Sequence, residues 1–223
     1  MNVIVSKAIA DVCPGFKGVI VEADVVNTKN NDALWDEIDK ATAAYNSIYT
    51  TESIKQLAPI DATRRVYKAC GKDPSRYRPA AESLLRRVLQ GKPLYHVDTL
   101  VDLLNYASMA TGYSLGGFDT ALFVGDTLTL GIGRKDEPYE GIGRGSLNIE
   151  GLPVYRDAQG GVGTPTSDSE RTKISINTRR LTVLINGYDG NEQGIKLCAK
   201  LIERLATTYA NASNISIREF VYL

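Results

Sequence analysis

Hydrophobic residues recur along this chain with two different periods, and each period predicts a different kind of element. Apolar positions three to four residues apart, typical of amphipathic helices, occupy 32–47, 79–90, 98–110 and 189–209. Two shorter helices are expected at 50–57 and 61–69, with Pro59 between them. Runs rich in β-branched residues, typical of strands, occupy 2–5, 17–26, 127–132, 147–149, 153–156, 180–186 and 215–223. The pattern therefore predicts an α+β fold.

The order of these elements predicts one domain with three regions along the sequence. A helix-rich region spans 30–111, a glycine-rich β region spans 112–186, and a helix and a strand occupy 187–223. Glycines punctuate the short β runs of the middle region, as expected where strands end in tight turns. We find no internal repeat and no linker long enough to divide the chain. Residues 1–223 are therefore expected to fold as a single domain.

Local signals predict where several of the helices begin and end. Pro79 stands where a helix can start without losing a hydrogen bond, and Gly91 stands where that helix would end. Asp98 is the expected N-cap of the helix at 98–110. Asp189 is the expected N-cap of the last helix, with Glu192 three residues further on completing a capping box.

The stretch GGVGTPTSDSERTKI at 160–174 is dense in polar groups and has no apolar period. Its glycines let a ligand approach the main chain, and its five hydroxyl side chains can donate and accept hydrogen bonds. Since no face of 160–172 can be buried, we expect a loop without regular helix or strand. Such a loop is either a solvated turn or a polar recognition loop.

Charge is balanced overall, with 26 basic and 26 acidic residues, which disfavours a general nucleic-acid binder. Nine basic residues lie between 64 and 92, against only Asp73 and Glu82, so this segment has a net charge of +7. Tyr67 and Tyr77 lie among them and are expected to stack on bases if RNA binds there. The alternative is a solvated helix face on which Glu82 pairs with Arg86. The residues expected to contact RNA are Arg64, Arg65, Arg76, Arg78, Arg86, Arg87 and Lys92.

Several classes of chemistry are disfavoured by what the chain contains. Cys13, Cys70 and Cys198 are odd in number and far apart, which argues against disulfides and against a zinc site. No signal peptide and no run of 18 apolar residues is visible, so we expect a cytoplasmic protein that does not span a membrane. The only histidine, His96, lies in a turn, so no catalytic residue is assigned and no metal or other cofactor is expected. Binding remains, or hydrolysis by a water held in a preorganised polar loop.

Three segments follow one another in a specific order. They are DPSRYRPAAESLLRRVLQGK at 73–92, VDLLNYASMATGYSLGGFD at 101–119 and GTPTSDSERTKI at 163–174, with LNIEGLPVYRDAQGGV before the last. Together they resemble the B3/B4 domain of the phenylalanyl-tRNA synthetase beta subunit, in a freestanding form. The resemblance extends over nearly the whole chain, from about Asp11 to Asn186. It implies a three-layer β-sandwich of unusual topology with flanking helices.

The resemblance also implies a function and a pocket. In the synthetase this domain hydrolyses tyrosine misattached to the phenylalanine tRNA, which implies a tRNA-binding trans-editing factor that deacylates mischarged aminoacyl-tRNA. Its expected partners are tRNA or aminoacyl-tRNA, with no membrane and no DNA. Arg171 is expected either to anchor a ligand carboxylate or phosphate or to pair internally with Asp168 or Glu150. The expected pocket residues are Asn105, Gly116, Glu150, Gly163, Thr164, Ser167, Ser169, Arg171 and Thr172.

One position departs from the family pattern. Bacterial synthetase editing domains carry a histidine in a Leu-His-Ala-Phe-Asp run, whereas the run here is LGGFD at 115–119, with Gly116 in place of the histidine. A second interpretation is therefore a non-catalytic module derived from the editing domain, which binds RNA, a free amino acid or a similar small ligand. The sequence contains no other part of a synthetase, so we expect no aminoacylation by this chain.

Overall fold

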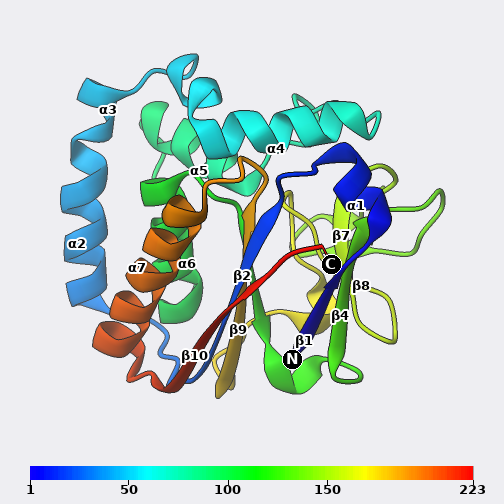
Figure 1. Ribbon diagram of the computed structural model, residues 1–223. Helices are drawn as coiled ribbons and strands as arrows, with labels where there is room; N and C mark the ends of the chain where they lie inside the picture. The colour runs from blue at the N-terminus through cyan, green and yellow to red at the C-terminus, as the bar shows by residue number, and fades with distance from the viewer. Residues whose placement is uncertain (223) are drawn as a thin grey trace.

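The computed structural model describes residues 1–222, and its elements form three layers (Figure 1). The middle layer, called here the central sheet, is antiparallel and has the strand order β10 (Ser213–Phe220), β2 (Lys17–Asp24), β9 (Arg180–Gly187) and β3 (Leu115–Asp119). The outer sheet has the order β1 (Asn2–Val5), β4 (Thr127–Ile132), β7 (Pro153–Arg156) and β8 (Gly161–Gly163). Within the outer sheet β1 pairs with β4 in parallel, and the other pairs are antiparallel. The predicted α+β fold is confirmed.

Alternating side chains of the central strands explain why this sheet is covered on both faces. Val19 and Val21 of β2 pack in the core beneath the helices, whereas Ile20 packs in the core between the two sheets. In β9, Val183 faces the helices and Leu184 faces the outer sheet. Because successive strand residues point to opposite faces, the unbroken apolar runs of β2 and β9 require a covering layer on each side.

Most of the helices lie on one side of the central sheet (Figure 1). Those packed in the core against this face are α2 (Asp32–Ala43), α6 (Thr99–Thr111) and α7 (Glu192–Ala210). A second group lies across one end of the sheets, comprising α3 (Tyr45–Ile48), the 3₁₀ turn η1 (Ser53–Gln56), α4 (Ala58–Ala69) and α5 (Ala80–Leu89). The remaining elements are α1 (Lys7–Val12), η2 (Thr120–Leu122), η3 (Glu170–Thr172) and the hairpin of β5 (Glu140–Gly141) and β6 (Gly145–Ser146).

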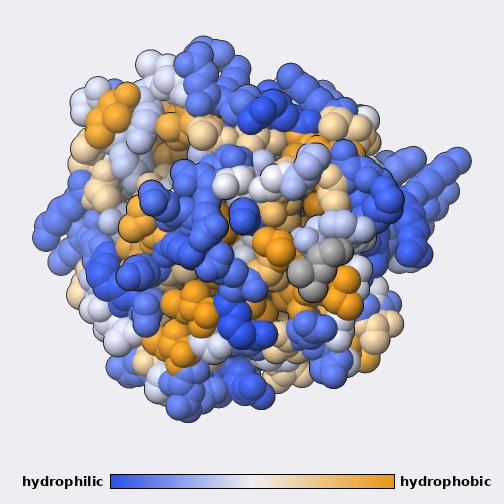
Figure 2. Space-filling view, in the orientation of Figure 1, coloured by the Kyte–Doolittle hydropathy of each residue, from blue (hydrophilic) through white to orange (hydrophobic). Residues whose placement is uncertain are grey.

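The surface of this arrangement is polar over most of the helical side. In the view of Figure 2, hydrophilic residues separate several small apolar patches from one another. No helix within residues 1–222 is long and apolar enough to cross a membrane.

Several predicted helix ends are confirmed, and one is wrong. The Asp98 side chain accepts a hydrogen bond from the Val101 amide at 2.9 Å, as an N-cap does. The last helix, in contrast, is capped by Asn191, whose Oδ1 accepts from the Gly194 amide at 3.0 Å. Asp189 lies just outside the helix, where its carboxylate accepts a hydrogen bond from the Tyr113 hydroxyl at 3.0 Å. Tertiary contact with Tyr113 thus decides the role of Asp189.

Other boundaries also differ from those predicted. Residues 147–149 form no strand, and 50–57 contains only the 3₁₀ turn η1. Helix α4 begins at Ala58, so Pro59 lies in its first turn, where a proline is tolerated, rather than ahead of it. The stretch 160–172, expected to be irregular, contributes β8 and η3. Strand β8 is only three residues long, and β7 supplies its hydrogen-bonding partners, so no sequence period could have predicted it.

Candidate functional site

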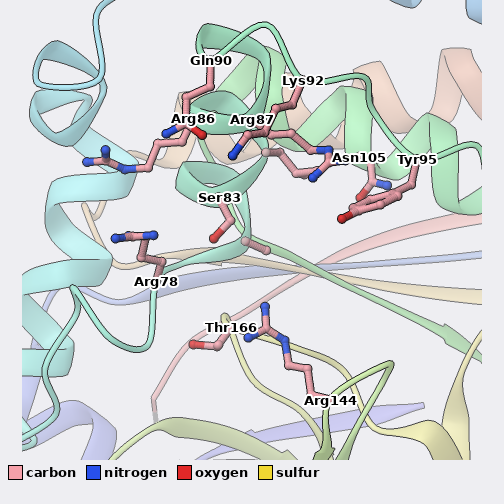
Figure 3. A pocket seen from close by; sticks show the side chains of 12 residues that line it. Arg78, Ser83, Arg86, Arg87, Gln90, Lys92, Tyr95, Asn105, Arg144 and Thr166 are labelled. Atoms are coloured by element: carbon pink, nitrogen blue, oxygen red, sulfur yellow. The ribbon is translucent and has the colours of Figure 1, made fainter.

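A groove of about 440 Å³ runs along α5, and its lining is strongly basic (Figure 3). Its charged lining residues are Arg78, Arg86, Arg87, Lys92 and Arg144, and no carboxylate lines it among residues 1–222. A cluster of cations raises the local concentration of anions. The geometry therefore suits a ligand that carries phosphate or carboxylate groups.

The position of α5, and with it one wall of the groove, depends on the buried carboxylate of Glu82. The Glu82 side chain is 0% exposed. Its Oε2 accepts from Arg64 of α4 at 2.8 Å, and its Oε1 accepts from Arg86 of α5 at 2.9 Å. The predicted pair of Glu82 with Arg86 along α5 is confirmed, with its carboxylate buried rather than on a solvated face, and the bond from Arg64 links α5 to α4. Arg64 is thereby occupied inside the protein.

The other cations of the groove are held more loosely. The Arg87 guanidinium lies over the Tyr95 ring at 3.9 Å, and its Nε donates to the Pro93 carbonyl at 2.6 Å. Arg78, Lys92 and Arg144 take part in none of the salt bridges formed within residues 1–222. Their charges are therefore available to a ligand.

A second cavity, of about 340 Å³, adjoins the groove and is largely apolar. Ala80, Leu84 and Asn105 line both cavities, so the two are contiguous. The apolar walls of the second cavity are formed by Val97, Val101, Leu104, Leu115, Ile142 and Ile174. Its polar lining residues are Asn105, Ser108, Asp168 and Lys173. We call the first cavity the basic groove and the second the apolar pocket.

Asp168 is the unusual polar residue of the apolar pocket. Its Oδ2 accepts from the Gly117 amide at 3.0 Å, whereas its Oδ1 is buried and has no hydrogen-bond partner. A side chain at Gly163 would place its Cβ 2.8 Å from that Oδ1, so the glycine leaves room for the carboxyl group. Burial raises the pKa of Asp168 to about 7, against the smaller opposing effect of the Gly117 amide.

Four of the five hydroxyl side chains of the 160–174 loop bond within the loop, and none of the five lines the apolar pocket. Thr164 Oγ1 donates to the Ser167 carbonyl at 3.0 Å. Ser169 Oγ accepts from the Arg171 amide at 3.3 Å, and the buried Thr172 donates to the Val162 carbonyl at 3.4 Å. This corrects the expectation that these hydroxyls converge on one cleft. The loop presents Asp168 and Lys173 to the apolar pocket instead.

Arg171 is paired inside the protein with a partner that the sequence did not indicate. Its two guanidinium nitrogens donate to the two carboxylate oxygens of Asp157 at 2.8 and 2.9 Å. Burial opposes ionisation of Asp157, but the Arg171 guanidinium and three backbone amides together outweigh it and hold the pKa of this carboxyl below its usual value. Neither Asp168 nor Glu150 is the partner, and neither Arg171 nor the exposed Glu150 lines either cavity.

Gly116, where the sequence resemblance leads us to expect a histidine, faces the core and does not line the apolar pocket. A Cβ at Gly116 would lie 2.7 Å from the ring of the buried Phe118. The neighbouring Gly117 lines the pocket, where an added Cβ would lie 2.5 Å from Leu104. Because strand residues alternate between faces, the space beside residue 116 belongs to the core, and Phe118 already fills it. A histidine could not be added here without moving Phe118.

The structure separates the residues expected to contact RNA into two groups. Arg78, Arg86, Arg87 and Lys92 line the basic groove. The other three do not line the groove. Arg64 pairs with Glu82, Arg65 pairs with Asp61, and Arg76 lies 5.6 Å from the centre of the Tyr77 ring.

Tyr67, expected to stack on bases, is fully buried and bonds to Thr166 Oγ1 at 2.9 Å, so it cannot contact RNA. Arg144 joins the groove from a distant hairpin and was not predicted. The signal that could have found it is an arginine between two glycines, because Gly143 and Gly145 both have φ +65° and turn the chain sharply.

These features define an α+β domain in which a basic groove adjoins an apolar pocket. The chain belongs to the B3/4 domain family, which matches residues 62–205. The fold is similar to that of an N-terminal fragment of the phenylalanyl-tRNA synthetase beta subunit from Pyrococcus horikoshii, with a TM-score of 0.55 and 12% identity. The likeness covers 97% of this chain and 50% of that chain, so this chain spans about half its length. A comparison with curated proteins found no match.

The buried Glu82 carboxylate gives a prediction about stability. Glu82→Gln keeps the shape of the side chain but leaves two arginines without their anion. We expect the free energy of unfolding to fall by about 3 kcal/mol. Glu52→Gln is the matched control, because Glu52 pairs with Lys55 on the surface and the control should unfold nearly as the wild type does. Equal urea midpoints for both variants would contradict the role assigned to Glu82.

Asp168 gives a prediction about pH. Its pKa of about 7 in the folded state lies above the unfolded value near 4, so between these values only the folded state holds the proton. The free energy of unfolding should therefore fall as pH rises from about 4 through 7, by up to about 4 kcal/mol. Asp168→Asn keeps an acceptor for the Gly117 amide and should lose this slope. Urea unfolding of both proteins at pH 5, 6, 7 and 8 tests this, and parallel pH profiles would contradict it.

Proposed function

We propose that this B3/4 domain binds the aminoacylated end of a tRNA and acts as a trans-editing factor that hydrolyses mischarged aminoacyl-tRNA. The observation that carries the proposal is the continuity of the basic groove and the apolar pocket through Ala80, Leu84 and Asn105. A charged tRNA end has the same order of chemistry, because its phosphates are followed by an ester-linked amino acid.

The two cavities contribute differently to such a complex. Guanidinium groups offer paired donors to phosphate oxygens, so the basic groove would supply most of the affinity. The apolar pocket would bury the amino-acid side chain, which stabilises the complex by about 1.5–3 kcal/mol for a large apolar residue. Discrimination between side chains that differ by one methylene is smaller, about 1–3 kcal/mol. Affinity thus depends on phosphates, and selection depends on the pocket.

Hydrolysis of an ester requires a water and hydrogen-bond donors for the developing oxyanion. Asn105 lies at the junction of the two cavities, where the ester would bridge a ribose in the groove and a side chain in the pocket. We assign its amide the role of donor to the ester carbonyl or to the attacking water. In the proposed reaction the nucleophile is a water molecule held at this junction.

A second function is favoured by one observation at the family's histidine position. Gly116 replaces that histidine, and Phe118 fills the adjacent space. A domain with this change could bind the same ligand, a free amino acid or RNA without hydrolysing an ester. Both functions require the basic groove, and they differ only in whether the ester is hydrolysed.

Binding is tested with uncharged and aminoacylated total tRNA at several salt concentrations. The triple variant Arg78→Ala, Arg87→Ala and Lys92→Ala removes groove cations without exposing the buried Glu82. The log–log salt dependence of affinity should flatten by about 0.7 for each cation that no longer reaches a phosphate. A control with the same charge change, Arg134→Ala, Arg179→Ala and Arg180→Ala, should keep the wild-type slope. Absent or salt-insensitive binding by the wild type would overturn both tRNA-based functions.

Turnover is tested by release of labelled amino acids from the same aminoacylated tRNA. Asn105→Ala should slow the release by about a hundredfold, since it removes one oxyanion donor, with little change in tRNA affinity. Gln90→Ala, which changes an amide at the groove but not at the junction, is the control. Tight binding by the wild type without release would select the non-catalytic function.

A further inference from the structure

The tip of the β5–β6 hairpin touches both cavities at once. Gly141 pairs with Gly145, and the three residues 142–144 between them form the tip. Ile142 lines the apolar pocket and is 41% exposed, whereas Arg144 lines the basic groove and is also exposed. One short turn therefore presents an apolar and a cationic side chain to the two halves of the site.

Arg144 faces the other cations of the groove from the opposite wall. Figure 3 shows Arg144 and Thr166 on one side of the groove, across from Arg78, Ser83 and Arg87. Like charges facing each other with no carboxylate between them repel. An anion bound between the two walls would remove this repulsion and would be held from both sides.

The hairpin is held in place by hydrogen bonds to the 160–174 loop. The Ile142 amide donates to the Asp168 carbonyl at 3.0 Å, and the Gly143 amide donates to Glu170 Oε1 at 3.1 Å. The Tyr139 hydroxyl, just before the hairpin, donates to the Ser167 carbonyl at 2.7 Å. These bonds fix the tip relative to the apolar pocket, so that Ile142 and Arg144 form part of a built wall rather than a free arm.

We propose that the hairpin tip binds both ends of the ligand segment that spans the two cavities. Arg144 contacts the phosphate, and Ile142 covers the apolar group. This inference rests on the proposed function and adds two ligand-binding residues that lie outside the basic segment 64–92. Arginine suits the task because its planar fork can donate two hydrogen bonds to one phosphate. Ile142 suits the cover because its exposed side chain would be removed from water when the pocket is filled.

Arg144→Ala tests the phosphate contact, with Arg134→Ala as the matched control. Both variants lose one positive charge, but Arg134 is exposed and lies outside both cavities. With uncharged total tRNA as the probe, Arg144→Ala should weaken binding about tenfold and flatten the salt dependence by about 0.7. Arg134→Ala should behave as the wild type. Equal affinities for the two variants would overturn the role of Arg144.

Ile142→Ser tests the contact between Ile142 and the apolar group of the ligand. Leu197→Ser on α7 is its control. Leu197 is 68% exposed and lines neither cavity. Ile142→Ser should bind uncharged tRNA as the wild type does, but should lose the extra affinity for tRNA charged with apolar amino acids. An unchanged preference for charged tRNA would overturn this role. If the wild type binds no tRNA, the proposed function itself fails, whereas binding that is insensitive to both tip variants refutes only the hairpin contacts.

Discussion

The central sheet must be buried on both faces, and most of the architecture follows from this constraint. Val19 and Val21 require helices on one side, and Ile20 requires a second sheet on the other. Strand β3 forms one edge of the central sheet. The apolar pocket forms there, between α6, Gly117 of β3 and the loop that carries Asp168. The site is thus a gap at the junction of layers, which is a common position for ligand cavities.

The cations around the basic groove are organised by the buried carboxylate of Glu82. Glu82 binds Arg64 on one side and Arg86 on the other, which holds α4 against α5 and keeps Arg86 at the groove. Taking a carboxylate out of water is costly unless cations and hydrogen bonds compensate it, and here two arginines do so. The +7 segment therefore has two parts, because some of its arginines stabilise the fold and others remain available to an anionic ligand.

The apolar pocket depends on glycines as much as on side chains. Gly163 leaves space for the Asp168 carboxyl, and Gly117 supplies the amide that donates to this carboxyl. Gly116 leaves space for Phe118, so the core occupies the volume that a side chain at this position would need. In this chain the polar loop closes on itself through its hydroxyls and offers Asp168 and Lys173 to the pocket. The loop therefore supplies a carboxyl group and an ammonium group to the pocket.

The sequence by itself determined the α+β class, most helices and strands, the Asp98 cap and the basic segment, because these depend on local periods and local capping. The resemblance to the family also pointed to Asn105, which lines both cavities. Only the tertiary structure decided that Arg171 pairs with Asp157, that Tyr67 is buried and that Arg144 joins the groove. Each of these outcomes depends on contacts between segments far apart in sequence, such as the 99 residues that separate Tyr67 from Thr166. A residue's type sets what it can bind, but the partner nearest to it in the fold decides what it does bind.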